Sequence, residues 1–217
     1  MKFYTAKTPK LVKWLFPKLV WEFSVSEKKI YLTFDDGPIP EITPWVLEQL
    51  ANYNAKATFF CIGDNVQKHP KIYHQLISEG HAIGNHTQHH VNGWKVSNVN
   101  YIKDTTEAKK TLEKAVKNKP EAVSRLFRPP YGKITPQLSK KLRKLGYTII
   151  MWDVLSGDFD MDLTPEKCLN NVLTHTEAGS IVVFHDSLKA YDKLRYVLPK
   201  VLKHFSNLGY SFERITL

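Results

Sequence analysis

The sequence predicts an α/β fold, a distorted and incomplete (β/α) barrel of about seven strands. Short β-rich runs alternate with longer helical patterns along the 217 residues. Strand runs such as 181–184 are apolar throughout, which is typical of parallel strands that helices cover on both faces. An open doubly wound sheet has the same alternation and remains an alternative, but seven or so units favour a barrel.

Seven strands are expected, at residues 30–34, 57–61, 81–83, 125–127, 147–152, 180–184 and 210–213. Six helices are expected between them, at residues 43–51, 66–79, 101–117, 135–145, 164–176 and 194–208. Thr-Pro pairs indicate three of the helix starts, because threonine caps a helix and proline suits its first position. These predicted caps are Thr43, Thr135 and Thr164.

No repeat or linker divides the chain, so we expect one domain over residues 30–217 and a segment 1–29 that packs on it. The apolar stretch 11–21 is interrupted by Lys13, Pro17 and Lys18, and is too short and too charged to span a bilayer. A basic, Trp-bearing segment can also lie on an anionic membrane surface. The sequence carries no signal-peptide pattern, which predicts a cytoplasmic protein, with peripheral membrane association as an alternative.

The charge balance favours anionic partners, because 31 Lys and Arg stand against 21 Asp and Glu. The lysines are spread along the chain, which is typical of a solvated surface. Aromatic and basic residues do not interleave, so no nucleic-acid partner is expected. The protein is expected to be a monomer. The two cysteines, Cys61 and Cys168, form neither a disulfide framework nor a cysteine zinc site. Cys61 lies in an apolar run and is expected to be a buried thiol.

Reactive side chains follow five of the predicted strands, at the carboxyl end of each. They are Asp35 and Asp36, His86, Arg128, Asp153, and His185 with Asp186. In α/β barrels this edge is where active sites assemble, because the loops there converge on one mouth. One such coincidence is weak evidence for a site, whereas five are strong evidence.

A metal site is predicted from the pair His86 and His90, four residues apart. If this segment forms a helical turn, both imidazoles lie on one side, about 5–6 Å apart at Cβ. The adjacent carboxylates of Asp35 and Asp36 repel each other unless a cation or an arginine lies nearby. Two histidines and one carboxylate leave a position open for water, which is the catalytic zinc pattern. Zn²⁺ is the first expectation and other divalent ions remain open, as does a solvated turn without metal.

These segments resemble the five ordered motifs of the polysaccharide deacetylases, carbohydrate esterase family 4, which carry the chitooligosaccharide-deacetylase homology domain. The motifs are TFDDGP at 33–38, HTQHH at 86–90, RPPYG at 128–132, WDVLSGDF at 152–159 and VFH at 183–185. The resemblance covers roughly residues 30–217, and five motifs in order are highly specific. It implies a (β/α) barrel with fewer than eight complete units.

The resemblance also implies roles for residues in the first three motifs. Asp35 would act as general base, while Asp36, His86 and His90 would hold the metal. Arg128 would orient Asp35.

For the remaining positions, the resemblance implies that the backbone N–H of Tyr131 helps to hold the oxyanion. His185 would be the general acid, with Asp158 orienting it. The chain departs from the family pattern at Phe159, where tryptophan is common, and at Val183, where leucine is frequent. The change at Phe159 puts the shape of the acetyl-methyl pocket in question.

The expected function is metal-dependent removal of N-acetyl groups from N-acetylglucosamine-type sugars, with an N-acetylated glycan or oligosaccharide as partner. The chemistry is coherent without the family, because a divalent ion lowers the pKa of bound water towards ~7 and polarises a carbonyl. Two alternatives stay open at this point. One is a hydrolase of O-acetyl groups or small amides, and the other is a basic binding protein that retains the site without turnover.

Overall fold

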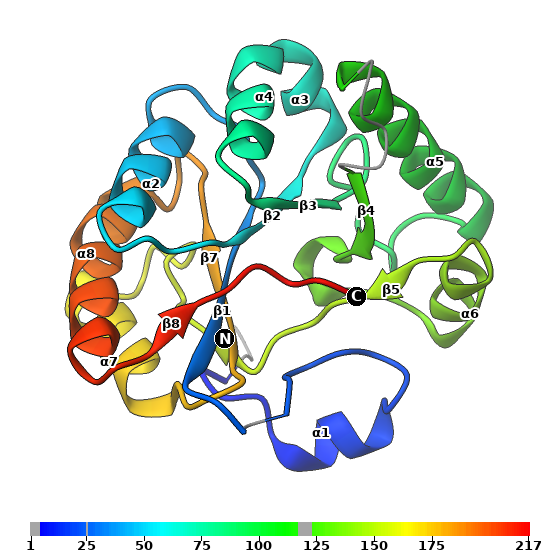
Figure 1. Ribbon diagram of the computed structural model, residues 1–217. Helices are drawn as coiled ribbons and strands as arrows, with labels where there is room; N and C mark the ends of the chain where they lie inside the picture. The colour runs from blue at the N-terminus through cyan, green and yellow to red at the C-terminus, as the bar shows by residue number, and fades with distance from the viewer. Residues whose placement is uncertain (1–4, 25, 117–122) are drawn as a thin grey trace.

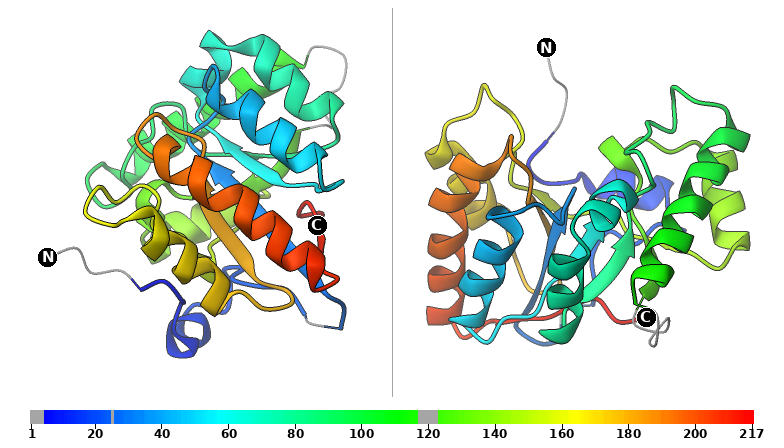
Figure 2. Two further views of the ribbon diagram at one scale, coloured as in Figure 1. Left: turned by 90° about the vertical axis from the view of Figure 1, so that its left-hand side faces the viewer. Right: turned by 90° about the horizontal axis from the view of Figure 1, so that it is seen from above.

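The computed structural model describes residues 5–24, 26–116 and 123–217. Its strands pair in parallel in one sheet with the order β5-β4-β3-β2-β1-β7-β6, and β8 pairs with β1 off this path. The sheet curls and the helices lie around its outside (Figures 1 and 2). The predicted incomplete (β/α) barrel is therefore confirmed, and the open doubly wound sheet is not adopted.

The strands are β1 (Lys29–Asp35), β2 (Thr58–Cys61), β3 (Ala82–Asn85), β4 (Val123–Phe127), β5 (Thr148–Ile149), β6 (Val154–Leu155), β7 (Ile181–His185) and β8 (Ser211–Phe212). The α-helices are α1 (Lys10–Leu15), α2 (Ile42–Ala51), α3 (Gly63–Lys68), α4 (Pro70–Ser78), α5 (Asn98–Ala115), α6 (Pro136–Lys144), α7 (Pro165–His175) and α8 (Tyr191–Asn207). A short 3₁₀ helix, η2, spans Pro130–Gly132. Among the described residues, no helix combines the length and the apolar character that crossing a membrane requires.

The core lies between the central strands and the helices that cover them. Phe34 of β1 stacks on Phe59 of β2 at 5.0 Å and on Phe184 of β7 at 5.9 Å between ring centroids. All three rings are buried. Cys61 is also fully buried and free, as predicted. The apolar strands thus bury both faces, which holds the carboxyl ends of β1, β2 and β7 at a common level.

Two helices differ from the prediction. The helix expected at 66–79 is divided into α3 and α4 at His69, because the following Pro70 lacks an N–H and keeps His69 out of the helical conformation. The helix expected at 101–117 begins earlier, at Asn98, where Ser97 caps it by accepting a hydrogen bond from the Asn100 N–H. Its expected end at residue 117 lies outside the described residues.

The predicted threonine caps hold at two of three positions. Thr135 and Thr164 each accept a hydrogen bond from the backbone N–H three residues later. Thr43 does not cap α2, because it lies within the helix and Glu41 occupies the cap position. The Thr43 hydroxyl instead donates to the buried Asp186 carboxylate at 2.5 Å, so a tertiary contact takes the group that a cap would use.

The predicted strand at 147–152 is much shorter, and a further strand, β6, follows it. β5 and β6 are the first and last strands in the order of the sheet, and the N-terminal segment lies against both. Val20 N–H donates to Ile149 O at 2.9 Å, and Leu155 N–H donates to Ala6 O at 2.8 Å. The segment thus hydrogen-bonds to both ends of the strand path.

Asp153 does not reach the reactive edge, so that expectation is wrong. Its N–H donates to Ile181 O at the start of β7, which places it towards the opposite edge of the sheet. Its fully buried carboxylate lies 2.7 Å from Lys7 Nζ and 2.6 Å from Lys13 Nζ. It also accepts a hydrogen bond from the Ser180 hydroxyl at 2.6 Å. The carboxylate therefore anchors the N-terminal segment to the barrel.

We expect Asp153→Asn to lower the free energy of unfolding by about 1–3 kcal/mol, because two partly buried lysines lose their shared anion. Urea unfolding measures the change. Asp64→Asn is the control: it removes an exposed pair with Lys68, worth less than about 0.5 kcal/mol. Equal losses in the two variants would contradict the anchoring role.

Candidate active site

The parallel register gathers the predicted site residues at one edge of the barrel. Asp35 at the end of β1 pairs with Phe60 of β2 on one side and with His185 of β7 on the other. Asn85 at the end of β3 pairs with Phe127 of β4, so the residues that follow them, His86 and Arg128, leave the sheet at the same edge. Strands far apart in sequence therefore deliver their functional groups to one mouth.

Asp36, His86 and His90 form a cluster that can hold a metal ion. One ligand atom of each lies within 4.8 Å of the others. His90 Nε2 is 3.2 Å and His86 Nε2 is 3.7 Å from Asp36 Oδ1. That oxygen is buried and accepts no hydrogen bond. A buried carboxylate oxygen without a hydrogen bond is costly unless a cation binds it. Because this oxygen faces two imidazole nitrogens, the three residues fit a divalent ion.

The tautomer of His86 also suits a metal ligand. Its Nδ1 lies 2.8 Å from the carbonyl oxygen of Arg128, which can only accept, so Nδ1 carries the proton and Nε2 presents its lone pair to Asp36. Burial, together with the neighbouring His90, lowers the pKa of His86 to about 3 against the opposing effect of Asp36. Burial likewise lowers the pKa of His90. Both imidazoles are thus neutral, the form that binds metal.

The segment that carries the two histidines is not the helical turn that their spacing predicts. Thr87 and His90 have positive φ values of 66° and 54°, and the chain bends between them. The Asn85 side chain accepts from Thr87 N–H at 2.8 Å. Asp104 of α5 accepts from the backbone N–H groups of Gln88 and His89, at 2.8 and 3.1 Å. The imidazoles therefore converge because tertiary contacts hold a strained loop.

His89 contacts Asp104 and is not part of the cluster. Its Nδ1 lies 2.6 Å from the other carboxylate oxygen of Asp104. Asp104 therefore holds the histidine loop through one side chain and two backbone groups. Sequence reasoning missed Asp104, because a lone aspartate within a polar helix carries no signal of its role.

Asp35 is paired with a completely buried arginine. Arg128 Nη1 lies 2.8 Å from Asp35 Oδ1 and 2.6 Å from the Thr33 hydroxyl. Its Nη2 donates to Met151 O at 2.8 Å, and its guanidinium stacks over the Phe60 ring at 4.2 Å. Arg128 is therefore an internal group and not a residue of a surface loop. The pairing holds the Asp35 carboxylate in one orientation.

His185 is held by Asp158 through two hydrogen bonds. Its Nδ1 lies 2.8 Å from Asp158 Oδ1, and its backbone N–H donates to Oδ2 at 2.8 Å. Burial would lower the pKa of His185, but the charge and hydrogen bond of Asp158, with smaller contributions from Asp36 and Asp35, raise it to about 9. His185 is therefore protonated at neutral pH and can donate a proton. The Phe159 ring packs edge-on against it at 5.1 Å.

Tyr131 lies at the rim of the cluster with a 60% exposed side chain. Its φ of 60° is a strained value for tyrosine, as is the φ of 85° at Asp36. The Tyr131 hydroxyl lies 3.1 Å from His90 Nδ1, which leaves Nε2 of His90 towards Asp36. The family resemblance implies a role for the Tyr131 backbone, and this side-chain contact with a candidate ligand is additional.

Comparisons with known proteins identify the relatives of this chain. The family model described as polysaccharide deacetylase matches residues 24–150, more than half of the chain. A Bacillus cereus peptidoglycan-N-acetylglucosamine deacetylase is 36% identical over 199 residues, 91% of each chain. A chitooligosaccharide deacetylase of Azorhizobium caulinodans is 36% identical over 161 residues, 74% of this chain and 75% of the relative.

A solved structure has the same fold along almost its whole length. It is a peptidoglycan N-acetylglucosamine deacetylase in complex with 4-naphthalen-1-yl-N-oxidanyl-benzamide. It superposes with a TM-score of 0.84 at 29% identity, over 96% of this chain and 95% of its own. With the motif-bearing edge of the barrel, these matches establish that the chain belongs to the polysaccharide deacetylase family.

Proposed function

We propose that this protein is a metal-dependent hydrolase that removes N-acetyl groups from N-acetylglucosamine-type sugars or glycans. The observation that carries the proposal is the unpartnered, buried Asp36 oxygen between His86 and His90, with two further acid–base groups at the same edge. The relatives named as peptidoglycan and chitooligosaccharide deacetylases support the substrate class. The chain's excess of positive charge is compatible with an acidic glycan.

Asp36, His86 and His90 would hold one divalent ion, with Zn²⁺ the first candidate for a site of two imidazoles and one carboxylate. Such an ion supplies a Lewis acid for the acetyl carbonyl and makes water more acidic. The roles of Asp36 and Asp35 differ, since Asp36 faces the imidazoles while Asp35 faces Arg128.

Asp35 is the proposed general base. Its pairing with Arg128 holds the carboxylate in one orientation, so it can take a proton as water attacks the acetyl carbon. Arg128 acts through Asp35 and positions it. The tetrahedral oxyanion that develops is proposed to accept a hydrogen bond from the backbone N–H of Tyr131, whose strained conformation sets the direction of that group.

His185 is the proposed general acid. The carbon–nitrogen bond breaks to leave acetate and the sugar amine, and the amine nitrogen is too basic to depart as an anion. His185 therefore donates a proton to it from Nε2, while Asp158 holds Nδ1–H and keeps the imidazolium charged. Asp158 thus tunes and orients the acid.

Acetate release from a panel of glycans is the direct test of the function. We expect release from N-acetylglucosamine oligomers or peptidoglycan fragments, loss of release with a chelator, and recovery when Zn²⁺ is added back. Matched N-acetyl and O-acetyl substrates separate an amidase from an esterase. Metal binding without acetate release from any member of the panel would instead favour a binding protein.

Two aspartate variants test the proposed division of labour. We expect Asp36→Asn to lose bound metal, because a charged ligand is removed from the cluster. Asp35→Asn should keep the metal and lose turnover by about 10²–10⁴-fold, the usual contribution of a general base. Metal analysis of purified protein, alongside acetate release, measures both effects. Equal metal loss in the two variants would overturn the assignment.

The pH profile tests the role of Asp158. The activity should fall on the alkaline side as His185 loses its proton, and Asp158→Asn removes the charge that raises the pKa of His185. The alkaline limb of kcat/KM should therefore move to lower pH by about one unit or more. Asp192→Asn, an exposed carboxylate on α8, is the matched control and should leave the limb in place. An unshifted limb in Asp158→Asn would contradict the role of His185 as acid.

A further inference from the structure

Helix α1 presents an unusually apolar surface. No residue of this helix is buried. Leu11 is 63% exposed, Trp14 74%, Leu15 55%, and the following Phe16 46%. We refer to these four side chains as the α1 ridge. Single exposed apolar residues are ordinary on a protein surface, whereas four within six residues indicate a contact surface.

The α1 ridge is held rigidly although it packs little. Lys13, on the opposite side, lies 2.6 Å from the buried Asp153, and Lys7 binds the same carboxylate from the other end of the segment. Figures 1 and 2 show α1 apart from the helices that surround the sheet. The apolar side chains are therefore fixed outwards before any partner arrives, which reduces the entropy lost on binding.

A groove of about 550 Å³ lies beside the ridge, against residues 132–136 and α6. Its floor and walls are mainly apolar, and they include Val12, Leu15, Leu19, Trp21, Ile134 and Met151. Gly132 and Lys133 also line the groove, and they directly follow Tyr131, so part of its wall comes from the segment that carries a candidate site residue.

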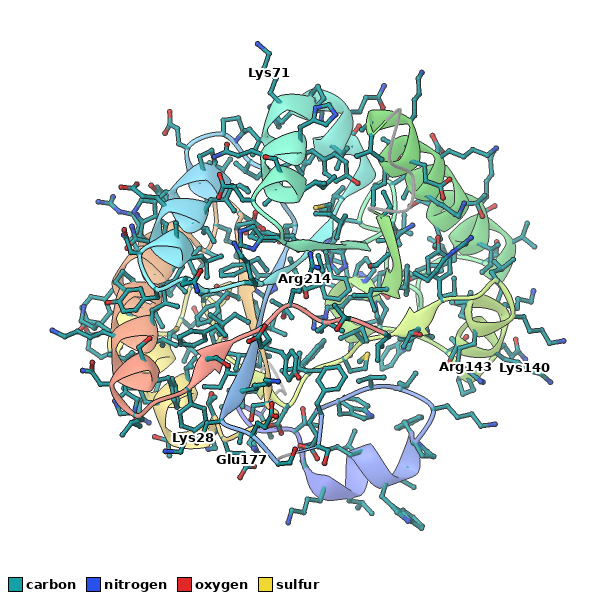
Figure 3. All side chains as sticks on the ribbon, in the orientation of Figure 1. Lys28, Lys71, Lys140, Arg143, Glu177 and Arg214 are labelled. Carbon is teal, nitrogen blue, oxygen red and sulfur yellow. The ribbon has the colours of Figure 1, made fainter. Side chains whose placement is uncertain are left out.

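The charged side chains that line the groove are all cationic. Lys18, Lys133, Lys140 and Arg143 line it, and no aspartate or glutamate does. Within the part of the chain that the structure describes, none of these four cations forms an ion pair, and Arg143 Nε is buried without a hydrogen-bond partner. Figure 3 labels Lys140 and Arg143 close together on α6. The groove thus combines an apolar interior with an unneutralised cationic rim.

We propose that the α1 ridge and this groove form a docking surface for an anionic phospholipid bilayer. An outward tryptophan beside leucines suits the boundary between headgroups and acyl chains, and the groove can receive an acyl chain. The unpaired cations complement the negative charge of lipid phosphates. A second copy of this chain fits poorly, because it would bring two sets of unpaired cations together. The inference is independent of the deacetylase chemistry.

Vesicle sedimentation with the full chain tests the proposal. We expect binding to vesicles that contain phosphatidylglycerol with phosphatidylcholine, much weaker binding to phosphatidylcholine alone, and weakening by added salt. Equal binding to both vesicle types, or no binding to either, would overturn the proposal.

Surface variants locate the contact. Trp14→Ala combined with Leu15→Ala should reduce partitioning into anionic vesicles by about tenfold or more, because both side chains lose burial in the interface. Lys140→Ser and Arg143→Ser should each reduce it by about fivefold. The controls are Leu208→Ala, a half-exposed leucine after α8, and Lys71→Ser on α4, which Figure 3 shows far from Arg143. Both controls should bind as the unchanged protein does.

Two further measurements keep the outcome clear. Thermal unfolding and acetate release from a soluble oligosaccharide should be unchanged in the Trp14 and Leu15 double variant, because both residues are exposed and lie outside the proposed catalytic residues. Sedimentation equilibrium without lipid should give a monomer. A dimer that Trp14→Ala dissociates would instead assign this surface to self-association and overturn the bilayer proposal.

Discussion

The buried guanidinium of Arg128 is the interaction on which the rest of the site depends. A fully buried cation is stable only when its hydrogen bonds are satisfied and its charge is paired. Asp35, Thr33 and the carbonyl of Met151 meet that demand, and Phe60 covers the guanidinium plane. Arg128 therefore joins the proposed base to the chain that leads from β5 to β6.

The same residue also reaches the candidate metal site through its backbone. The carbonyl oxygen of Arg128 accepts the proton of His86 Nδ1, which selects the tautomer of that imidazole. One residue thus connects the base, one candidate ligand and the span between β5 and β6. Loss of its side chain would leave the buried Asp35 without its counter-ion, so Arg128 stabilises the fold and the site together.

Acidic groups are concentrated at this edge, and their repulsion must be offset. Arg128 pairs with Asp35, and protonated His185 pairs with Asp158. For Asp186, burial and the nearby charge of Asp36 raise the pKa to about 8, so its carboxyl group is largely neutral at pH 7. Asp36 faces two neutral imidazoles, an arrangement that fits a bound cation.

The sequence by itself determined much of this protein. Short apolar runs, of the length of buried parallel strands, predicted the barrel. The reactive residues that follow those runs predicted one shared edge for the site. Both signals can be detected in short stretches of the sequence. The exact geometry of the site is not determined by residues that are close in the sequence. The spacing of His86 and His90 predicted a helical turn, yet contacts from Asn85 and Asp104 hold a bent loop. Likewise, Asp153 looked like a site residue, but the lysines of the N-terminal segment bind it at the other edge. Only the tertiary structure decided these points, because each depends on a partner far away in the chain.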